Sequence, residues 1–236
     1  MSEPTTDGAM PESLVVFADA LGTKDHSSDP NRCQTFLTCL KEASAASDRR
    51  LHAAERQIRG FGYRWFSDCL TMSAPSPSLH TLLSSMRLAA QIQVEFLLRG
   101  VFLRGAMTSG PHHHSENIDY GPALTEAAVI EQNMTRHPRI LLSTGLVERI
   151  RPAASDDLIE LVSVDVEDDS VFLNVFKFLA ATERATAREK ITSAIDITQG
   201  DVQMKYLWLA GCFNQTSGAK TFIPHDGGHH FREFRP

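Results

Sequence analysis

The sequence lacks an excess of positive charge, which proteins that bind double-stranded nucleic acid use to neutralise the phosphate backbone. Its 236 residues include 23 lysines and arginines against 29 aspartates and glutamates, so the formal net charge is -6. We therefore expect no nucleic acid among its partners. An acidic chain can still bind a smaller polyanion, such as a nucleotide, when metal ions neutralise the phosphates.

A long uninterrupted apolar run is also missing. The most apolar helical stretch, residues 79–98, contains Arg87, Glu95 and two glutamines, whereas a membrane-spanning helix needs about 20 predominantly apolar residues. The opening segment, MSEPTTDGAMPE, is polar and acidic, unlike a signal or transit peptide. We expect no membrane partner.

The four cysteines form no Cys-x-x-Cys pair of the kind that binds structural metals. Unclustered thiols in a chain of this length suit a reducing compartment, and we expect a cytoplasmic protein. Two common catalytic signatures are missing as well. The sequence has neither the Gly-x-Ser-x-Gly elbow of serine hydrolases nor a Walker A phosphate-binding loop.

Three adjacent histidines, His112, His113 and His114, stand in a polar segment between two predicted strands. Adjacent side chains in a hairpin loop point in different directions, and no acid or thiol completes a metal-ligand set in the sequence pattern. We therefore expect this segment to be a solvated loop.

The composition that is present, 42% hydrophobic and 22% charged residues, is typical of a soluble globular domain. Residues 1–12 are expected to form a flexible tail, residues 13–216 a single domain, and residues 217–236 an irregular C-terminal tail. Apolar patterning predicts strands at residues 13–18, 55–66, 69–73, 101–108, 118–120, 139–143, 158–166 and 171–178. It predicts helices at residues 31–46, 78–99, from 122 onward, 181–195 and 200–215. Helices packed on a mainly antiparallel sheet make an α+β domain.

Two aspartates stand at the ends of predicted strands. Asp19 follows the apolar run LVVFA, and Asp68 lies in the two-residue separator of the predicted hairpin YRWFSDCLTMS. If these strands are neighbours, both carboxylates meet at one edge of the sheet, where they repel each other unless a cation lies between them. Oxygen ligands suit Mg²⁺ or Mn²⁺, and the backbone amides of residues 20–23 could bind phosphates at the turn. The alternative is structural, with Asp19 a helix cap and Asp68 an ordinary turn residue.

Four segments resemble, in the same order, the motifs of class III nucleotidyl cyclases. They are VVFADALGTK, YRWFSDCLTMS, FLRGAMTSG and IDYGPALTEAA, and the resemblance covers residues 13 to about 143. It implies a ferredoxin-like, palm-type α+β domain. Within that superfamily the sequence is most similar to the pyrimidine cyclases of bacterial anti-phage (Pycsar) defence, through FSD, LRGAMTSG, HSENIDYGPAL, HPRILLS and KYLWLAGCFNQ.

The resemblance implies roles for individual residues. Asp19 and Asp68, with the carbonyl oxygen of Ala20, would bind two Mn²⁺ or Mg²⁺ ions, and Arg104 would bind the triphosphate and complete the catalytic set. The nucleotide-binding residues implied are Phe17, Leu21, Gly22, Thr23, Tyr63, Arg64, Arg104 and Thr125. The family also implies a nucleoside triphosphate substrate and a homodimer with active sites at the interface. Its cyclic nucleotide product is read by a separate effector.

The sequence departs from the purine cyclases at four positions. Thr125 and Val129 stand where those enzymes carry an Asn and an Arg. Arg64 and Ile118 stand where adenylyl cyclases read the base with a Lys and an acid. Because an arginine only donates hydrogen bonds and uracil offers two carbonyl acceptors, UTP is favoured, with conversion to 3′,5′-cyclic UMP. CTP is the close alternative, and a purine cyclase or an inactive nucleotide-binding domain also remains open.

In this hypothesis, the alternation of side chains along the strand places the base-binding Arg64 on the same face as the metal-binding Asp68. Arg64, Phe66 and Asp68 share one face of the hairpin, and the side chains between them point to the other face. Unless a bulge interrupts the strand, Arg64 is expected to point towards the pocket that contains Asp68. In the same hypothesis, the nearby Tyr63 helps to close the base pocket.

Overall fold

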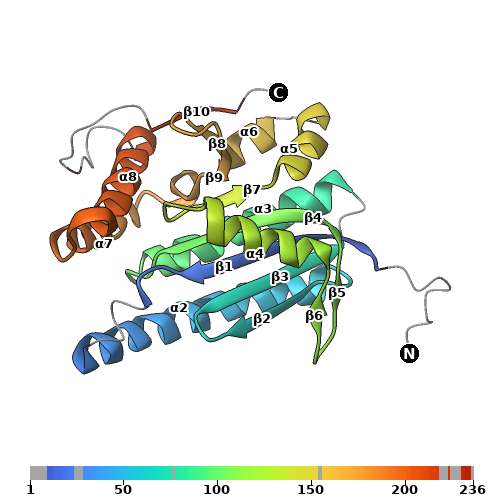
Figure 1. Cartoon of the computed structure of the whole chain (residues 1–236), viewed down its shortest axis with the longest axis horizontal. Helices are drawn as coiled ribbons and strands as arrows, with labels where there is room; N and C mark the ends of the chain where they lie inside the picture. The colour runs from blue at the N-terminus through green and yellow to red at the C-terminus, as the bar shows by residue number, and fades with distance from the viewer. Residues whose placement is uncertain are drawn as a thin grey trace.

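An eight-stranded sheet with helices on both sides organises the chain in the computed structural model (Figure 1). The structure describes residues 10–23, 29–75, 78–153, 156–217, 223 and 230–234. The strands of the main sheet are β1 (Glu12–Ala20), β2 (Gly62–Phe66), β3 (Cys69–Pro75), β4 (Leu103–Pro111), β7 (Ile140–Leu142), β8 (Val162–Asp165), β9 (Val171–Leu173) and β10 (Phe231–Glu233). A separate small hairpin contains β5 (His113–His114) and β6 (Asp119–Tyr120). The helices are α2 (Pro30–Gln57), α3 (Leu79–Leu97), α4 (Pro122–Met134), α5 (Thr144–Ile150), α6 (Asp156–Leu161), α7 (Arg184–Asp196) and α8 (Gly200–Ser217).

The strand order in the main sheet is β10-β8-β9-β7-β4-β1-β3-β2. Among the described strands of this sheet, all neighbours are antiparallel except β4 and β7. The first half runs β1-α2-β2-β3-α3-β4 along the chain and places its strands in the order β4-β1-β3-β2, which is a ferredoxin-like arrangement. The expected α+β domain with a mainly antiparallel sheet is confirmed.

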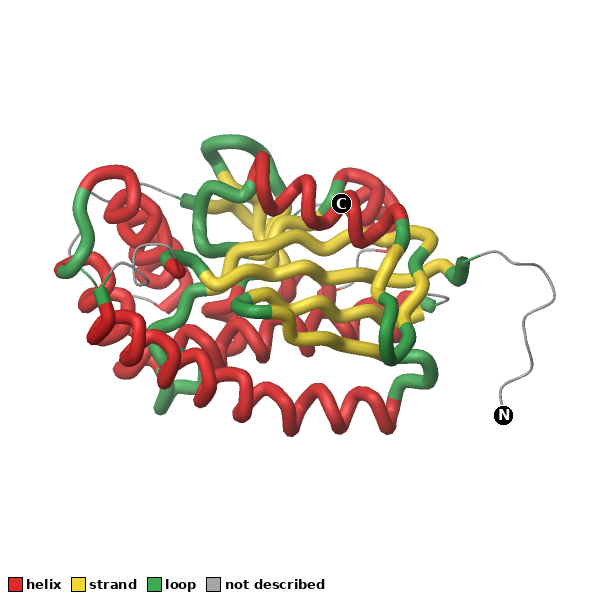
Figure 2. Tube along the Cα trace, turned by 60° about the horizontal axis from the view of Figure 1, so that its bottom comes forward, coloured by secondary structure: helices red, strands yellow, loops and turns green. Residues whose placement is uncertain are grey.

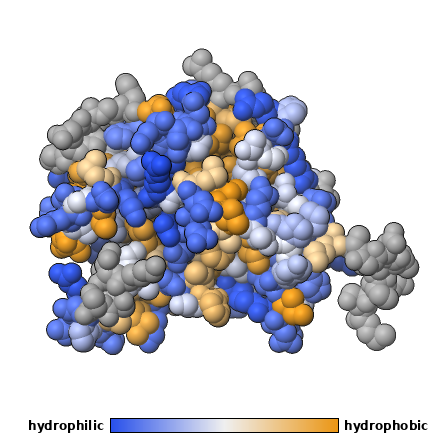
Figure 3. Space-filling model, viewed as in Figure 1, coloured by the Kyte–Doolittle hydropathy of each residue, from blue (hydrophilic) through white to orange (hydrophobic). Residues whose placement is uncertain are grey.

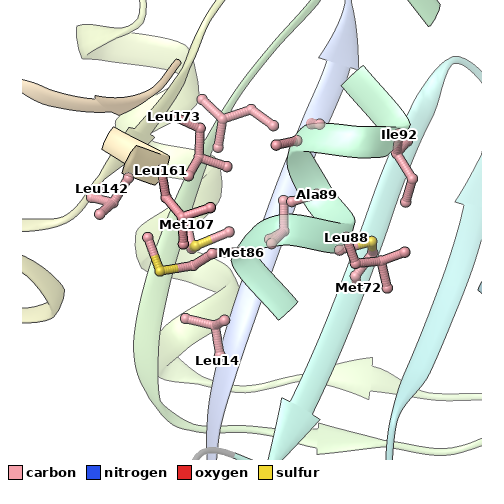
Figure 4. Close-up of a cluster of buried hydrophobic side chains, with 14 of the residues drawn as sticks. Leu14, Met72, Met86, Leu88, Ala89, Ile92, Met107, Leu142, Leu161 and Leu173 are labelled. Carbon is pink, nitrogen blue, oxygen red and sulfur yellow. The ribbon is translucent and has the colours of Figure 1, made fainter. Parts of the chain in front are cut away.

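Helices α2 and α3 cover one face of this sheet, and Figure 2 shows the long helices along that side with the strands visible on the other. The contact is apolar because every second residue of β1, including Leu14 and Val16, points into it. In Figure 4, Met86 of α3 lies close to Leu14 and to Met107 of β4. Burying side chains of this size contributes roughly 1.5–3 kcal/mol each, which makes the sheet a firm platform for the opposite face.

Helix α2 is longer than the sequence predicted. Asp29 is its N-cap, as expected, and accepts hydrogen bonds from the backbone amides of Asn31 at 2.8 Å and Arg32 at 3.0 Å. The helix continues to Gln57, so the strand predicted from residue 55 is wrong and β2 begins only at Gly62. The segment AASDRRLHAAERQ is rich in good helix formers, which explains the continuation.

Other elements also differ from the prediction. Residues 158–161 belong to α6 and residues 175–178 to a 3₁₀ helix, because a short apolar run does not distinguish a buried helix from a strand. In the segment expected to be an irregular C-terminal tail, β10 pairs with β8, and Phe231 and Phe234 are buried. Of the predicted N-terminal tail, residues 1–9 lie outside the described part, and Glu12 already begins β1.

The expectation of a solvated histidine loop is wrong. The backbone of His113 and His114 pairs with β6, and the side chain of His112 is only 1% exposed. The histidine segment is ordered by Asp119, which the hairpin register brings to the same side as His112 and His114.

None of the described helices combines the length and apolarity that a bilayer crossing requires.

Candidate functional site

A row of three residues crosses three neighbouring strands of the main sheet near their ends. Asp19 near the end of β1 lies opposite Cys69 of β3 on one side and opposite Arg104 of β4 on the other. Residues directly opposite each other in antiparallel strands project to the same face. Their neighbours Ala18 and Leu70 point into the core under α2 and α3, so the row points to the opposite face.

The hairpin turn brings Asp68 to this row. Ser67 has a positive φ of 56°, a conformation that two-residue hairpin turns require. The Ala20 amide donates a hydrogen bond of 3.2 Å to the Asp68 carbonyl, which ties the turn to the end of β1. Ligand atoms of Asp19, Asp68 and Cys69 all lie within 4.8 Å of one another. Asp19 and Asp68 therefore lie together at one edge of the sheet, as the sequence predicted.

The turn after β1 adds oxygen atoms to the same place. Gly22 has a φ of 92°, which glycine adopts without strain and which turns the chain back over the strand end. The hydroxyl of Thr23 contacts the Ala20 carbonyl oxygen at 3.0 Å and a carboxylate oxygen of Asp68. The Ala20 carbonyl oxygen and the Asp68 carboxylate, both predicted metal ligands, therefore contact the same hydroxyl group of Thr23.

The electrostatics of the pair favour a cation. Burial raises the pKa of Asp19, and the nearby charge of Asp68 raises it further. The Cys69 thiol donates to Asp19 Oδ1 at 3.4 Å, and burial together with the Asp19 charge raises the pKa of Cys69 to about 12. The two carboxylates and the Ala20 carbonyl offer oxygen atoms, which is the kind of ligand that Mg²⁺ and Mn²⁺ prefer.

Arg104 is paired with two carboxylates. Its Nη2 lies 3.6 Å from Asp19 Oδ2, and its Nε lies 2.7 Å from Glu131 Oε1 on α4. Glu131 is buried, which raises its pKa. Glu131 was not among the site residues that the sequence predicted. The signal that could have found it is its spacing, because Ala123, Ala127 and Glu131 recur every four residues and form the buried side of α4.

Arg64 projects to the same face as the row, as the alternation predicted, because it lies opposite Thr71. Its Nη2 donates to the carbonyl oxygens of Ser115 at 2.8 Å and Glu116 at 2.9 Å. These contacts use the N–H groups of one nitrogen, so they leave three of the five guanidinium donors unused.

Tyr63 is not brought to this face. It packs against the core under α2, and its hydroxyl lies 3.3 Å from His52 Nδ1. The structure therefore does not bring Tyr63 and Arg64 together as two walls of one base pocket.

Three other residues implied by the resemblance lie at different depths. Phe17 is half-buried on the same face as Asp19, two residues before it. Leu21 is buried, and its amide donates to the Phe102 carbonyl at 2.8 Å. Since the backbone amides of Ala20 and Leu21 already donate hydrogen bonds, a phosphate at this turn would use the amides of residues 22 and 23.

Thr125 is exposed on α4, where its hydroxyl donates to the Gly121 carbonyl at 3.2 Å.

Two cavities adjoin these residues. One has a volume of about 750 Å³ and is bordered by Arg104, Arg136 and Lys205. The other has a volume of about 570 Å³ and begins at Gly22, at the turn where the sequence predicted phosphate binding. The cationic residues that border this second cavity are Arg32, Arg99 and Lys190. Both cavities therefore offer positive charge beside an otherwise acidic site.

Apolar side chains are exposed around this face. Figure 3, which has the viewpoint of Figure 1, shows apolar side chains gathered near the middle of the molecule. Phe66 at the tip of the β2–β3 hairpin is 74% exposed, and Val129 on α4 is 50% exposed. Exposed apolar side chains that gather into a patch mark surfaces that contact a partner.

Comparison with known proteins gives no family model and no curated protein that matches this chain. Several solved structures resemble it at low identity. The monomeric guanylyl cyclase domain of the RhoGC fusion protein from Blastocladiella emersonii matches with 14% identity and a TM-score of 0.49, over 70% of this chain and 95% of that chain. The adenylyl cyclase CyaB from P. aeruginosa matches with 12% identity and a TM-score of 0.47, over 69% and 91% of the two chains.

The guanylate cyclase domain of RhGC from Catenaria anguillulae, solved with GTP, matches with 14% identity and a TM-score of 0.49. It covers 69% of this chain and 94% of that chain. Since these identities and scores are low, the functional proposal rests on the side chains of this chain.

Proposed function

We propose that this protein is a metal-dependent nucleotide cyclase of the class III type, which converts UTP to 3′,5′-cyclic UMP and pyrophosphate. The observation that supports this most strongly is the convergence of Asp19, Asp68 and the Ala20 carbonyl at one edge of the sheet, with Arg104 in the same row. Two carboxylates held this close without a cation are unfavourable, and the pKa of Asp19 is raised by burial first and by the charge of Asp68 second.

The reaction joins two parts of one substrate. The ribose 3′-oxygen forms a bond to the α-phosphorus, the bond from that phosphorus to the bridging oxygen breaks, and pyrophosphate leaves with the electron pair. The hydroxyl proton passes to water. Divalent ions, Mn²⁺ or Mg²⁺, when bound would supply charge neutralisation for the attacking and leaving oxygens.

The residues of this chain hold and orient the substrate. Asp19, Asp68 and the Ala20 carbonyl would hold the ions, and the planar guanidinium of Arg104 suits phosphate oxygens. For Arg104 to bind the triphosphate, it must exchange its contact with Glu131 for a phosphate. The cavity that begins at Gly22 offers further cations for the leaving pyrophosphate.

The base would be read by Arg64. Its remaining N–H groups can donate to the two carbonyl oxygens of uracil, whereas cytosine offers one carbonyl and an amino donor. Ile118, 56% exposed, cannot accept the adenine amino group as an acid would. CTP is the close alternative substrate. By resemblance, the cyclic product would serve as a second messenger in anti-phage defence and would be read by a separate effector.

A second copy of the chain completes this proposal. The exposed Phe66 and Val129 lie on the side of the sheet that carries the site, and α2 and α3 leave that side uncovered. A homodimer that buries them would place the site at the interface. We expect light scattering at micromolar concentration to report the dimer mass, and a monomer would count against a shared site.

A specific observation also favours a second candidate, a nucleotide-binding domain without turnover. Thr125 donates to its own helix and Val129 is apolar, so neither can act as the Asn or Arg of the purine cyclases.

One experiment separates these functions. Purified protein is incubated with Mn²⁺ and each of the four nucleoside triphosphates, and the products are separated by chromatography. We expect cyclic UMP from UTP. Consumption of ATP or GTP instead would make it a purine cyclase, and calorimetric binding without any product would support the non-enzymatic candidate.

A further inference from the structure

The β5–β6 hairpin carries a second group of metal-ligand side chains, separate from the aspartate pair. Figure 1 shows this hairpin across one end of the main sheet. His112 and His114 are separated by one residue and therefore point to the same side of the strand, and the register places Asp119 opposite His114. His113, between them, is exposed and points away.

The three side chains converge on one oxygen atom. Oδ1 of Asp119 lies 2.8 Å from Nε2 of His112 and 3.4 Å from Nδ1 of His114. All three ligand atoms lie within 4.8 Å of one another. Two imidazoles and one carboxylate form a ligand set that suits borderline cations such as Zn²⁺.

Hydrogen bonding within the cluster is the simpler explanation, since Nε2 of His112 lies 2.8 Å from Oδ1 of Asp119. The side chain of His112 is 1% exposed, and its Nδ1 has no hydrogen-bond partner among the described residues. A cation between the three ligand atoms would replace these contacts by coordination of the same atoms, and metal binding separates the two explanations.

The surroundings hold two of the ligands in place. Thr71 of β3 donates from Oγ1 to Asp119 Oδ2 at 2.5 Å, which leaves Oδ1 directed at the histidines. The ring of His114 lies over Gly62, where a β-carbon would come within 2.0 Å of Cδ2. Only a glycine at this position leaves room for the ring, so β2 and β3 both shape this group.

We propose that His112, His114 and Asp119 bind one borderline divalent cation of the Zn²⁺ class, through Nε2, Nδ1 and Oδ1, with the fourth position taken by water. The ion fixes the β5–β6 hairpin on the main sheet. The loop of that hairpin supplies the carbonyls of Ser115 and Glu116 that hold Arg64, so the ion also fixes this arginine. The binding itself does not depend on the proposed cyclase activity.

The test uses the full chain, freed of metal by a chelator. Co²⁺ serves as a spectroscopic probe, because imidazole ligation in a four-coordinate site gives visible absorption, and Zn²⁺ is then titrated against it. We expect one equivalent of Co²⁺ to give this absorption and to be displaced by Zn²⁺. His114→Ala should weaken Zn²⁺ binding by more than about 100-fold, and Thr71→Val by about 10-fold, as for outer partners of metal ligands.

Two variants control this result. His113→Ala removes an exposed histidine of the same strand and should bind Zn²⁺ like the unaltered protein. Asp68→Asn should also keep the Co²⁺ spectrum, which separates this site from the aspartate pair and separates failure here from failure of the cyclase proposal. Equal Zn²⁺ affinity of His114→Ala and the unaltered protein would overturn the proposal, as would loss of the Co²⁺ spectrum in Asp68→Asn.

Hydrogen exchange gives an independent readout. Zn²⁺ should slow amide exchange in residues 113–120 of the unaltered protein and of His113→Ala, but not of His114→Ala. Exchange in these residues that does not respond to Zn²⁺ in the unaltered protein would contradict the fixing of the hairpin.

Discussion

Nε of Arg104 lies 2.7 Å from Oε1 of the buried Glu131 on α4. Glu131 therefore competes with any phosphate for the guanidinium that is proposed to bind the triphosphate. The contact joins α4 to β4 at the row that contains Asp19, so Glu131 acts on a bound phosphate only through Arg104.

The first prediction concerns this competition. Glu131→Gln removes the charge that holds Arg104, so UTP should bind about two- to fivefold more tightly, as expected for an ion pair worth roughly 0.5–1 kcal/mol. The measurement is the dissociation constant of UTP with Ca²⁺ or without metal, by calorimetry. Glu126→Gln, on the exposed side of the same helix, is the control and should change nothing. Weaker binding by Glu131→Gln would mean that Glu131 orients Arg104 productively.

The second prediction concerns the repulsion between the two aspartates. The folded-state pKa of Asp19 is raised above its ordinary value of 3.8 by burial and by Asp68, so the folded chain binds this proton more readily than the unfolded chain. The stability of the metal-free protein therefore falls as pH rises from the ordinary value through the raised pKa. Asp19→Asn should stabilise the metal-free protein at pH 7 by about 1 kcal/mol.

Urea unfolding at pH 7 without metal measures this change. The same variant should lose the stabilisation that Mn²⁺ gives the unaltered protein, because a ligand that binds only the folded state raises its stability. A less stable Asp19→Asn would show that the contacts of Asp19 with Arg104 and Cys69 outweigh the repulsion.

How much of this site the sequence could predict depends on how local each contact is. Asp19 and Asp68 were placed together correctly because a strand end and a two-residue turn are local features. Glu131 was missed because its position depends on where α4 crosses β4. The approach of Asp119 to His112 depends on hairpin register. The pairing of β10 with β8 joins segments 66 to 70 residues apart, for which composition gives no signal.

The third prediction concerns base selection. Arg64→Ala should lower kcat/KM for UTP more than for CTP, because only uracil offers two carbonyl acceptors to the lost donors. We expect the UTP to CTP ratio to fall by about tenfold, the value of one good hydrogen bond to a charged group. Arg59→Ala, an exposed arginine before β2, is the matched control. An unchanged ratio would remove Arg64 from base recognition.

The fourth prediction concerns the buried ion pair at the other end of the sheet. Arg139 and Asp165 are each 1% exposed and in contact, and Asp165 also accepts from Trp208 Nε1 at 3.0 Å. Arg139→Met leaves the buried carboxylate without its cation and should destabilise the protein by about 3–5 kcal/mol.

Urea unfolding measures this loss, with Arg232→Ala as the control. Arg232 pairs with Asp169 at 2.7 Å, but both side chains are more than half exposed, so its removal should cost less than about 1 kcal/mol. Equal losses of unfolding free energy in the two variants would show that burial does not determine how much the Arg139 ion pair contributes to stability.

The proposed metal site is tested directly by the formation of cyclic UMP from UTP and Mn²⁺ by Asp68→Asn, compared with Asp169→Asn. Both aspartates lie in turns, but Asp169 is exposed and far along the chain from the metal row. We expect Asp68→Asn to lose cyclisation by about 100-fold or more, as for other groups that stabilise transition-state charge, and Asp169→Asn to keep it. Unchanged cyclic UMP formation by a correctly folded Asp68→Asn would contradict the assignment of Asp19 and Asp68 as the metal ligands.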